Sequence, residues 1–226
     1  MFTRIVSAAA LAGVFAGMLL TAIQQIQIAP LIRKAEVQEE AATAASQPVH
    51  QHASSVPTQE AWAPTADWER LLAAAVSNTS LAIGFALLLG AAMSQRGSKT
   101  GFRAGLLWGI AGYAVFFVAP SLGLPPELPG TEAAPLNDRT LWWVGTVVVS
   151  AEGLWLAAFS NKSTIRVLGL VLLVAPHAIG APQPAIHDQT NSVELAKEFL
   201  RATYLANAAF WLILGGLLGL LNKAKK

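Results

Sequence analysis

Residues 202–222 read ATYLANAAFWLILGGLLGLLN and carry no charged side chain between Arg201 and Lys223. A helix of about 20 apolar residues crosses the roughly 30 Å hydrocarbon layer of a bilayer. Five other runs have a similar length, and only Glu152 interrupts one of them: 5–32, 71–95, 104–126, 140–161 and 167–187. They are rich in Ala, Leu and Gly and lack the alternation of barrel strands. The sequence therefore predicts an all-α membrane protein, a bundle of six transmembrane helices.

The composition indicates the same class. Of the 226 residues, 54% are hydrophobic and 12% are charged, whereas a soluble domain usually has about 25% charged residues. The absence of cysteine excludes disulfides, thiolate nucleophiles and cysteine metal sites. The formal net charge of +2 comes from scattered Lys and Arg, so nucleic acid is not an expected partner. The motifs of ATPases, hydrolases and zinc proteases are missing, so we expect neither enzymatic activity nor a resident cofactor.

The charges predict the orientation when the six runs are threaded alternately. With the N-terminus inside, the inner segments hold nine basic residues and no acid, while the outer segments hold six basic and twelve acidic residues. Lys and Arg are enriched on the cytoplasmic side of membrane proteins. We therefore expect both termini in the cytoplasm. If residues 1–32 were instead a cleaved signal peptide, five spans would remain, but this run is longer than the usual 7–15-residue signal core.

The chain is expected to have three parts. A first transmembrane helix covers 1–32, and an extracytoplasmic low-complexity loop covers 33–70, where Ala, Ser, Thr, Gln and Pro accompany several Glu. Such a composition favours a flexible, acidic loop, with helix near each membrane end as the ordered part. Residues 71–226 form a five-helix transmembrane region with a proline-rich outer loop at 121–139. Glycines at four-residue spacing, such as Gly105 with Gly109 and Gly215 with Gly219, predict close helix contacts.

Glu152 is the one ionisable residue inside a predicted span. It lies about 12 residues beyond Thr140, which at 1.5 Å per residue is roughly 18 Å below the outer surface. Charged side chains at such depth usually face a bundle interior or a water pathway. Two interpretations stay open: a cation or proton site, and a carboxyl that only fixes helix packing.

His177 follows Pro176 near the outer end of the fifth run. Because proline removes one helical hydrogen bond, it frees a carbonyl beside this imidazole. Interrupted helices of this kind mark ion sites in transporters, although a purely structural kink is the alternative. Asn78 and Asn207 have a similar expected depth, at roughly 10 Å and 8 Å from the outer ends of their runs. We hypothesise a polar vestibule shared by these side chains above Glu152, with simple interhelical hydrogen bonds as the alternative.

The outer loops contain further candidate metal ligands. His50 and His52 form an H-x-H pair in the acidic loop, and Glu127 lies in GLPPELPG at 123–130, whose three prolines make a stiff turn. Imidazole together with carboxylate suits borderline divalent ions such as cobalt, nickel and zinc. We expect these residues to collect metal at the pore mouth, whereas chance solvated residues are the alternative for the two histidines.

Four blocks of the chain resemble one known family. A first span ending at Ala29-Pro30-Leu31 is followed by GLPPELPG at 123–130, RTLWW at 139–143 with Thr146, and APHAIGAP at 175–182. In this order they resemble the CbtA family of proposed cobalt transporter subunits, over nearly the whole chain. The resemblance implies a bacterial inner-membrane protein linked to cobalamin biosynthesis, with a small single-span CbtB-type partner. Glu127, Arg139 and His177 fall within its motifs, but it assigns them no ligand role.

The leading hypothesis is a lipid-embedded subunit that carries Co²⁺ inward as its substrate. In this hypothesis the outer acidic and histidine-bearing loops collect the ion, and His177, Asn78, Asn207 and Glu152 are successive stations. Two alternatives stay open. One is a non-transporting membrane scaffold, and the other is a carrier for another divalent metal or for a corrinoid.

Overall fold

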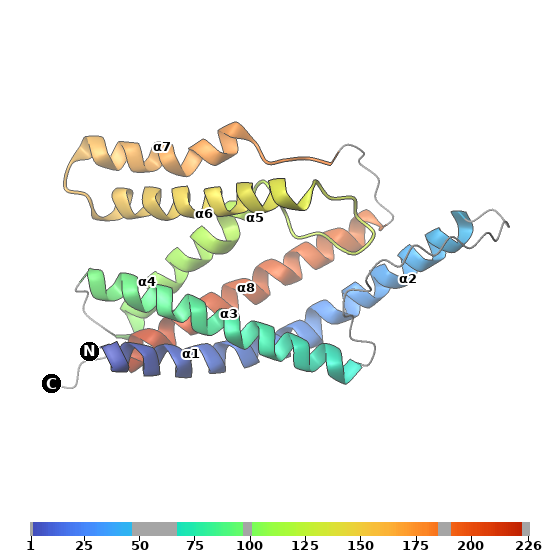
Figure 1. Cartoon of the computed structure of the whole chain (residues 1–226), viewed down its shortest axis with the longest axis horizontal. Helices are drawn as coiled ribbons and strands as arrows, with labels where there is room; N and C mark the ends of the chain where they lie inside the picture. Colours follow the sequence, from blue (N-terminus) through green and yellow to red (C-terminus); the bar gives the residue numbers. More distant parts are fainter. Residues whose placement is uncertain (1, 47–66, 97–100, 185–190, 223–226) are drawn as a thin grey trace.

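The computed structural model describes residues 2–46, 67–96, 101–184 and 191–222, and these residues contain no strand. Figure 1 shows the helices, two of which are π-helical turns named η. In chain order they are α1 (Phe2–Ile23), η1 (Gln24–Ile28), α2 (Ala29–Ser46), α3 (Asp67–Gln95), α4 (Phe102–Tyr113), η2 (Ala114–Val118), α5 (Ala119–Ser121), α6 (Leu136–Phe159), α7 (Ser163–Ile179) and α8 (Val193–Leu221). The predicted all-helical class is confirmed for the described residues.

Five of the six predicted runs form helices that are long and apolar enough to cross a membrane. They are Thr3–Thr43, Asp67–Gln95, Phe102–Ser121, Leu136–Phe159 and Val193–Leu221. The run predicted at 167–187 forms the shorter helix α7, of 17 residues. α7 ends at Ile179 because Gly180 takes a φ of +90° and two prolines follow closely. The structure thus has five long apolar helices and one short one where the sequence predicted six spans.

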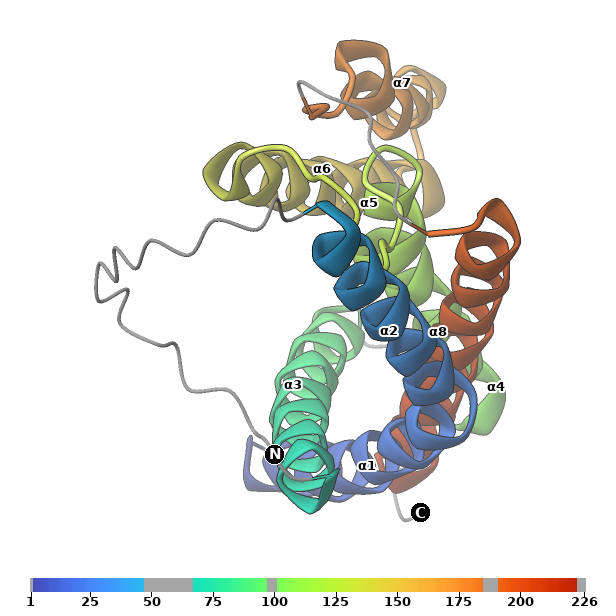
Figure 2. The same ribbon diagram turned by 90° about the vertical axis from the view of Figure 1, so that its right-hand side faces the viewer.

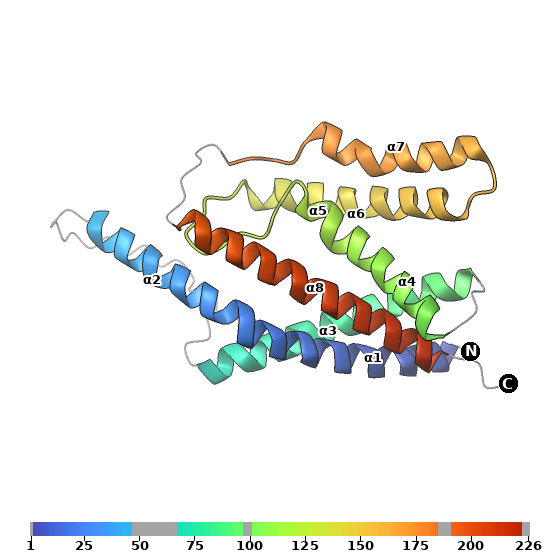
Figure 3. The same cartoon turned by 180° about the vertical axis from the view of Figure 1, so that it is seen from behind.

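Charge is distributed unequally between the two ends of the bundle. The start of α1, the end of α3, the start of α4, the turn between α6 and α7 and the end of α8 all lie at one end (Figures 1 and 3). We call it the basic end, because its described charged residues are Arg4, Arg96, Arg103, Lys162 and Arg166. We call the other the acidic end, where α2, the start of α3, loop 122–135 and the start of α8 carry most of the described acids. In chain order α1, α3, α4, α6, α7 and α8 alternate in direction between the two ends (Figures 1 and 3), and the membrane orientation expected from the charges stays a prediction.

The first helix continues past Ile32 into segment 33–70, which the sequence predicted to be a loop with helix near its two membrane ends. α2 reaches Ser46 and projects beyond the rest of the bundle at the acidic end (Figure 1). Ala, Glu and Gln dominate this stretch and are good helix formers. Glu36 also forms an ion pair with Arg70 of α3 at 3.2 Å. Residues 33–46 and 67–70 of the predicted loop are therefore helical, while His50 and His52 lie outside the described residues.

Two prolines are accommodated by a π-helical turn placed just before each. Pro30 and Pro120 have no amide hydrogen, and in a regular α-helix each ring would meet the carbonyl four residues earlier. Ala29 instead donates its N–H to the carbonyl of Gln24, and Ala119 donates to that of Ala114, five residues back. The wider turn lets each helix pass its proline without ending.

Glycines bring neighbouring helices into close contact. A Cβ on Gly215 of α8 would lie 2.7 Å from the Cα of Gly109 in α4, and one on Gly219 would lie 2.8 Å from the Cα of Gly105. The same kind of packing joins α1 to α3, through Gly13 and Gly17. The prediction that glycines at four-residue spacing mark close helix contacts is confirmed.

α6 and α7 form an antiparallel hairpin beside the other helices. They pack through Gly169, where a Cβ would lie 2.6 Å from the carbonyl oxygen of Gly153. The hairpin is joined to the bundle mainly by contacts of α6 with α5 and η2. Figure 2 shows the helices roughly end-on, in the order α3, α1, α8, α4 with α5, and α6. No described helix lies between α6 and α3 on the remaining side.

Candidate functional site

Residues of three sequence motifs, at 123–130, 139–143 and 175–182, meet at the acidic end of α6. Gly123 lies against the indole of Trp142, because a Cβ on this glycine would be 2.7 Å from Trp142 Cζ2. The same indole lies edge-on to the imidazole of His177, with ring centroids 6.3 Å apart. Glu127 and Arg139 form an ion pair at 3.5 Å. We call these five residues the motif cluster.

The proline-rich loop holds Glu127 in a defined position. At its start the N–H of Leu124 donates to the carbonyl of Pro120 at 2.9 Å. At its end Asn191, which precedes α8, donates from Nδ2 to the carbonyl of Pro129 at 2.6 Å. Because both ends are tied to helices and prolines restrict the backbone between them, the loop presents a fixed carboxylate.

A cavity of about 410 Å³ lies between η2, α5, the proline-rich loop and α6. Phe116, Phe117 and Trp143 contribute apolar walls, while Glu127 and Arg139 contribute charge. Cavities with mostly apolar walls and a few placed polar groups are typical of small-molecule sites. Glu127 and Arg139 keep 29% and 34% of their side chains exposed, so a solute at the acidic end can reach them.

His177 lies in the last turn of α7, where the helix stops. Pro176 cannot donate to the carbonyl of Leu172, which therefore loses its α-helical partner. Gly180 then ends the helix with a positive φ. The partly buried imidazole of His177 thus lies in the last turn of α7, directly after the proline that leaves the carbonyl of Leu172 without its α-helical partner.

Two buried hydroxyls on α6 were missed by the sequence analysis. Thr146 and Ser150 are only 2% and 1% exposed, and neither hydroxyl has a hydrogen-bond partner among the described residues. They follow Trp142, whose Nε1 is also unpartnered, at four-residue spacing and precede the contact of Gly153 with α7. All three therefore face the α6–α7 interface, and we call them the α6 polar column. Their spacing was visible in the sequence, but single hydroxyl residues are ordinary in membrane helices.

Asn78 and Asn207 do not share a vestibule with His177 in this structure. Asn78 of α3 donates from Nδ2 to Thr21 Oγ1 at 3.0 Å and to Gln24 Oε1 at 2.7 Å, at the interface with α1 and η1. Asn207 donates to the carbonyl of Thr203 within its own helix, at 3.0 Å. The structure therefore places these two amides in helix packing, on elements away from the α6–α7 hairpin.

Glu152 is exposed, and it lies on a different face of α6 from the polar column. It has no hydrogen bond or ion pair with a described residue. A charged side chain within a span costs about 2.5–3.5 kcal/mol on insertion scales. The structure thus separates Glu152 from His177, which the sequence analysis expected to line one route.

The described residues contain no group of three His, Asp or Glu side chains able to hold a metal ion. Of the candidate ligands, Glu127 and His177 are both in the motif cluster, and Glu152, Asn78 and Asn207 lie elsewhere. His50 and His52 are outside the described residues.

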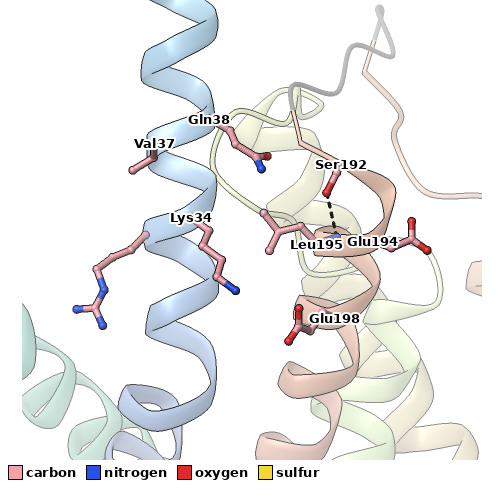
Figure 4. A pocket seen from close by; sticks show the side chains of 8 residues that line it. Lys34, Val37, Gln38, Ser192, Glu194, Leu195 and Glu198 are labelled. Atoms are coloured by element: carbon pink, nitrogen blue, oxygen red, sulfur yellow. Dashed lines mark hydrogen bonds between the residues drawn. The ribbon is translucent and has the colours of Figure 1, made fainter.

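A second cavity of about 650 Å³ lies between α2 and the start of α8. Lys34 of α2 and Glu198 of α8 extend into the space between the two helices (Figure 4). Ser192 caps α8 by accepting the N–H of Leu195 at 3.3 Å. The walls carry both signs of charge, and no feature of this cavity selects one class of ligand.

A family model described as "Probable cobalt transporter subunit (CbtA)" matches residues 2–223, which is nearly the whole chain. The chain belongs to the CbtA family. The match includes every segment of the motif cluster and of the α6 polar column. Neither a search of curated proteins nor a search of solved structures returned a match. The CbtA match and the apolar helices together identify a multi-pass membrane protein of a cobalt transporter family.

Proposed function

We propose that this chain is the membrane-embedded subunit of a Co²⁺ uptake system in the bacterial inner membrane. In this proposal it has six spans, with α7 as the shortest, and both termini are cytoplasmic. It works with a small single-span CbtB-type partner and supplies cobalt for cobalamin biosynthesis. The family match supports cobalt as the substrate. The described basic residues at the end that holds the start of α1 support the orientation.

The observation that carries the proposal is the placement of His177 in the motif cluster. The imidazole of His177 and the carboxylate of Glu127 both belong to the motif cluster, at the acidic end of α6. Imidazole nitrogen and carboxylate oxygen are ligands that Co²⁺ accepts. We propose that Glu127 attracts the cation to the acidic end and that His177 is the first side chain to bind it.

The inward route in this proposal follows the α6 polar column. Thr146 and Ser150 offer hydroxyl oxygens at successive turns below His177, and neither is occupied by a partner within the described structure. Buried polar groups are normally hydrogen-bonded, so two unpartnered hydroxyls on one face need an explanation. A cation moving along the α6–α7 interface, or the water molecules around it, would bind to these two hydroxyl oxygens.

The test is radiocobalt uptake into proteoliposomes that contain the full chain together with its partner. Changing His177→Ala, Thr146→Val or Ser150→Ala should lower the initial rate at limiting Co²⁺ by roughly tenfold, the scale on which metal sites lose affinity when a supporting group is removed. Ser94→Ala is the matched control, because Ser94 on α3 already bonds the carbonyl of Gly90 at 2.8 Å and lies outside the column. Uptake that stays unchanged in all three variants, at equal insertion, would overturn the route.

A non-transporting scaffold is the second candidate function. The hydrogen bonds of Asn78 to α1 and η1 and of Asn207 within α8 favour it, because both amides are already engaged by the protein itself. Proteoliposomes with the chain and its partner distinguish the two functions. Stable complex formation without cation flux supports the scaffold, whereas flux supports the transporter, and a panel of divalent ions and corrinoids identifies the substrate.

A further inference from the structure

Glu152 lies in an exposed stripe on α6. Leu141, Val148 and Trp155 are 73%, 58% and 38% exposed, and Gly145 is exposed as well. With Glu152 they recur at three- and four-residue spacing, so they share one side of the helix. We call these five residues the Glu152 stripe. α7 and α5 pack on other sides of α6 and leave most of the stripe uncovered.

The stripe faces the open side of the bundle, between α6 and α3. Phe159 lies seven residues after Glu152 and therefore on nearly the same side of α6. The guanidinium carbon of Arg96, at the end of α3, lies 4.6 Å from the centroid of the Phe159 ring. Trp155 meets Trp108 of α4 there, with ring centroids 6.2 Å apart. These contacts close this side at the basic end, and no described helix lies over the rest of it (Figure 2).

A glycine within the stripe leaves room for another helix. A Cβ built on Gly145 of α6 would meet no described atom within 4 Å. This differs from Gly215, where the backbone of α4 fills the corresponding space. Small residues at exposed positions of membrane helices let a neighbouring backbone approach closely.

We propose that a membrane-spanning helix of a different chain seats on the Glu152 stripe, between α6 and α3. In this complex an imidazole or ammonium group of the partner helix donates a hydrogen bond to the Glu152 carboxylate. The carboxylate of Glu152 favours such a partner helix over lipid and over a second copy of this chain. Lipid tails offer no donor to a carboxylate within the bilayer. A second copy of this chain, docked symmetrically by the same stripe, would bring two Glu152 carboxylates together.

This inference rests on the proposed role of the chain as one subunit of a larger assembly. It names the surface and the chemistry of the contact, and it does not depend on which ion is carried. Its test therefore uses no cobalt, so a failure of docking and a failure of cobalt transport are separate results.

Because the chain has no cysteine, single cysteines report helix contact cleanly. The full chain with Val148→Cys is reconstituted in phosphatidylcholine vesicles with synthetic Leu/Ala helices of 20 residues. Each peptide has a central His or, as the matched peptide, a central Leu, and one cysteine one turn before or after the centre. Copper phenanthroline with oxygen oxidises adjacent thiols to a disulfide, accepting two electrons while two protons are released.

The central-His peptide should cross-link to the Val148→Cys chain about threefold more than the central-Leu peptide, the preference expected from one average hydrogen bond between helices in a membrane. Adding Glu152→Leu should abolish that preference. Val174→Cys is the positional control, because Val174 is exposed on α7 away from the stripe and should show no preference. Equal cross-linking of the two peptides, a preference that survives Glu152→Leu, or dominant disulfide dimers of the chain itself would each overturn the proposal.

Discussion

The indole of Trp142 lies edge-on to the imidazole of His177, so α6 and α7 jointly fix the one histidine of the described helices. The angle between the two ring planes is 66°. Gly123 of the proline-rich loop lies against the six-membered ring of the same indole. A single aromatic ring thus connects three motifs, and the orientation of His177 depends on a residue that does not itself bind cations through nitrogen or oxygen lone pairs.

Removing this ring should impair cobalt uptake without removing the proposed ligand. Trp142→Ala is expected to raise the KM for Co²⁺ by roughly tenfold or more, because supporting residues of metal sites typically have effects of this size. Trp142→Phe keeps an aromatic ring and should change KM by less than about threefold. Initial uptake rates across a range of Co²⁺ concentrations measure both. An unchanged KM in the Trp142→Ala protein would show that the ring does not position His177 for binding.

Breaking the ion pair of Glu127 and Arg139 should affect cation capture more than stability. Both side chains are partly exposed, and exposed pairs contribute about 0–1 kcal/mol, so Glu127→Gln should barely change thermal unfolding. Loss of the carboxylate should lower uptake at limiting Co²⁺, and the difference from the unmodified protein should shrink as ionic strength rises. Asp138→Asn removes a nearby charge outside the motif cluster and is the control. An effect of equal size in both variants would indicate general surface charge rather than the loop carboxylate.

Adding one methyl group at Gly215 should destabilise the bundle. Its Cβ would lie 2.7 Å from backbone atoms of Gly109, so the helices α4 and α8 must separate, and overpacking of this kind costs about 1–3 kcal/mol. Gly145→Ala is the matched control, because its Cβ would meet open space. Unfolding of the purified chain in detergent, followed by circular dichroism, measures both. Equal stability of the two variants would contradict the close packing of α4 on α8.

Much of the helical fold was predictable because its causes are local. Uncharged runs indicate segments that lie in the lipid, and charged residues indicate segment ends that lie in water. Glycines at four-residue spacing indicate helices that pack closely. The end of α7 was harder to predict, because Gly180 stops the helix before the hydrophobic run is complete. The continuation of α2 was also difficult, since a polar Ala-rich segment is compatible with both helix and loop until a contact such as Glu36 with Arg70 holds it.

The arrangement of the site depended on contacts that spacing alone does not determine. Depth below the membrane surface suggested that His177 and Asn78 lie together, but depth does not fix which helices are neighbours. The structure pairs α3 with α1 and α6 with α7, so residues of equal depth are on separate interfaces. Conversely, Thr146 and Ser150 become candidates only because the structure buries their hydroxyls without a partner among the described residues. The sequence blocks that contribute to the motif cluster were recognised in advance. That their side chains contact one another was not predicted.

Replacing Asn78 should separate a packing role from a transport role. Asn78→Leu removes two hydrogen bonds across the α1–α3 interface, and at about 0.6 kcal/mol for each such bond in membranes the expected loss is about 1 kcal/mol. Asn207→Leu is the matched control, because its described bond stays within α8 and should matter less. Both variants should keep the uptake rate of the unmodified protein once equal amounts are inserted. If instead both lost uptake while keeping full stability, the amides would act on the transported ion, and the assignment of Asn78 to packing alone would be wrong.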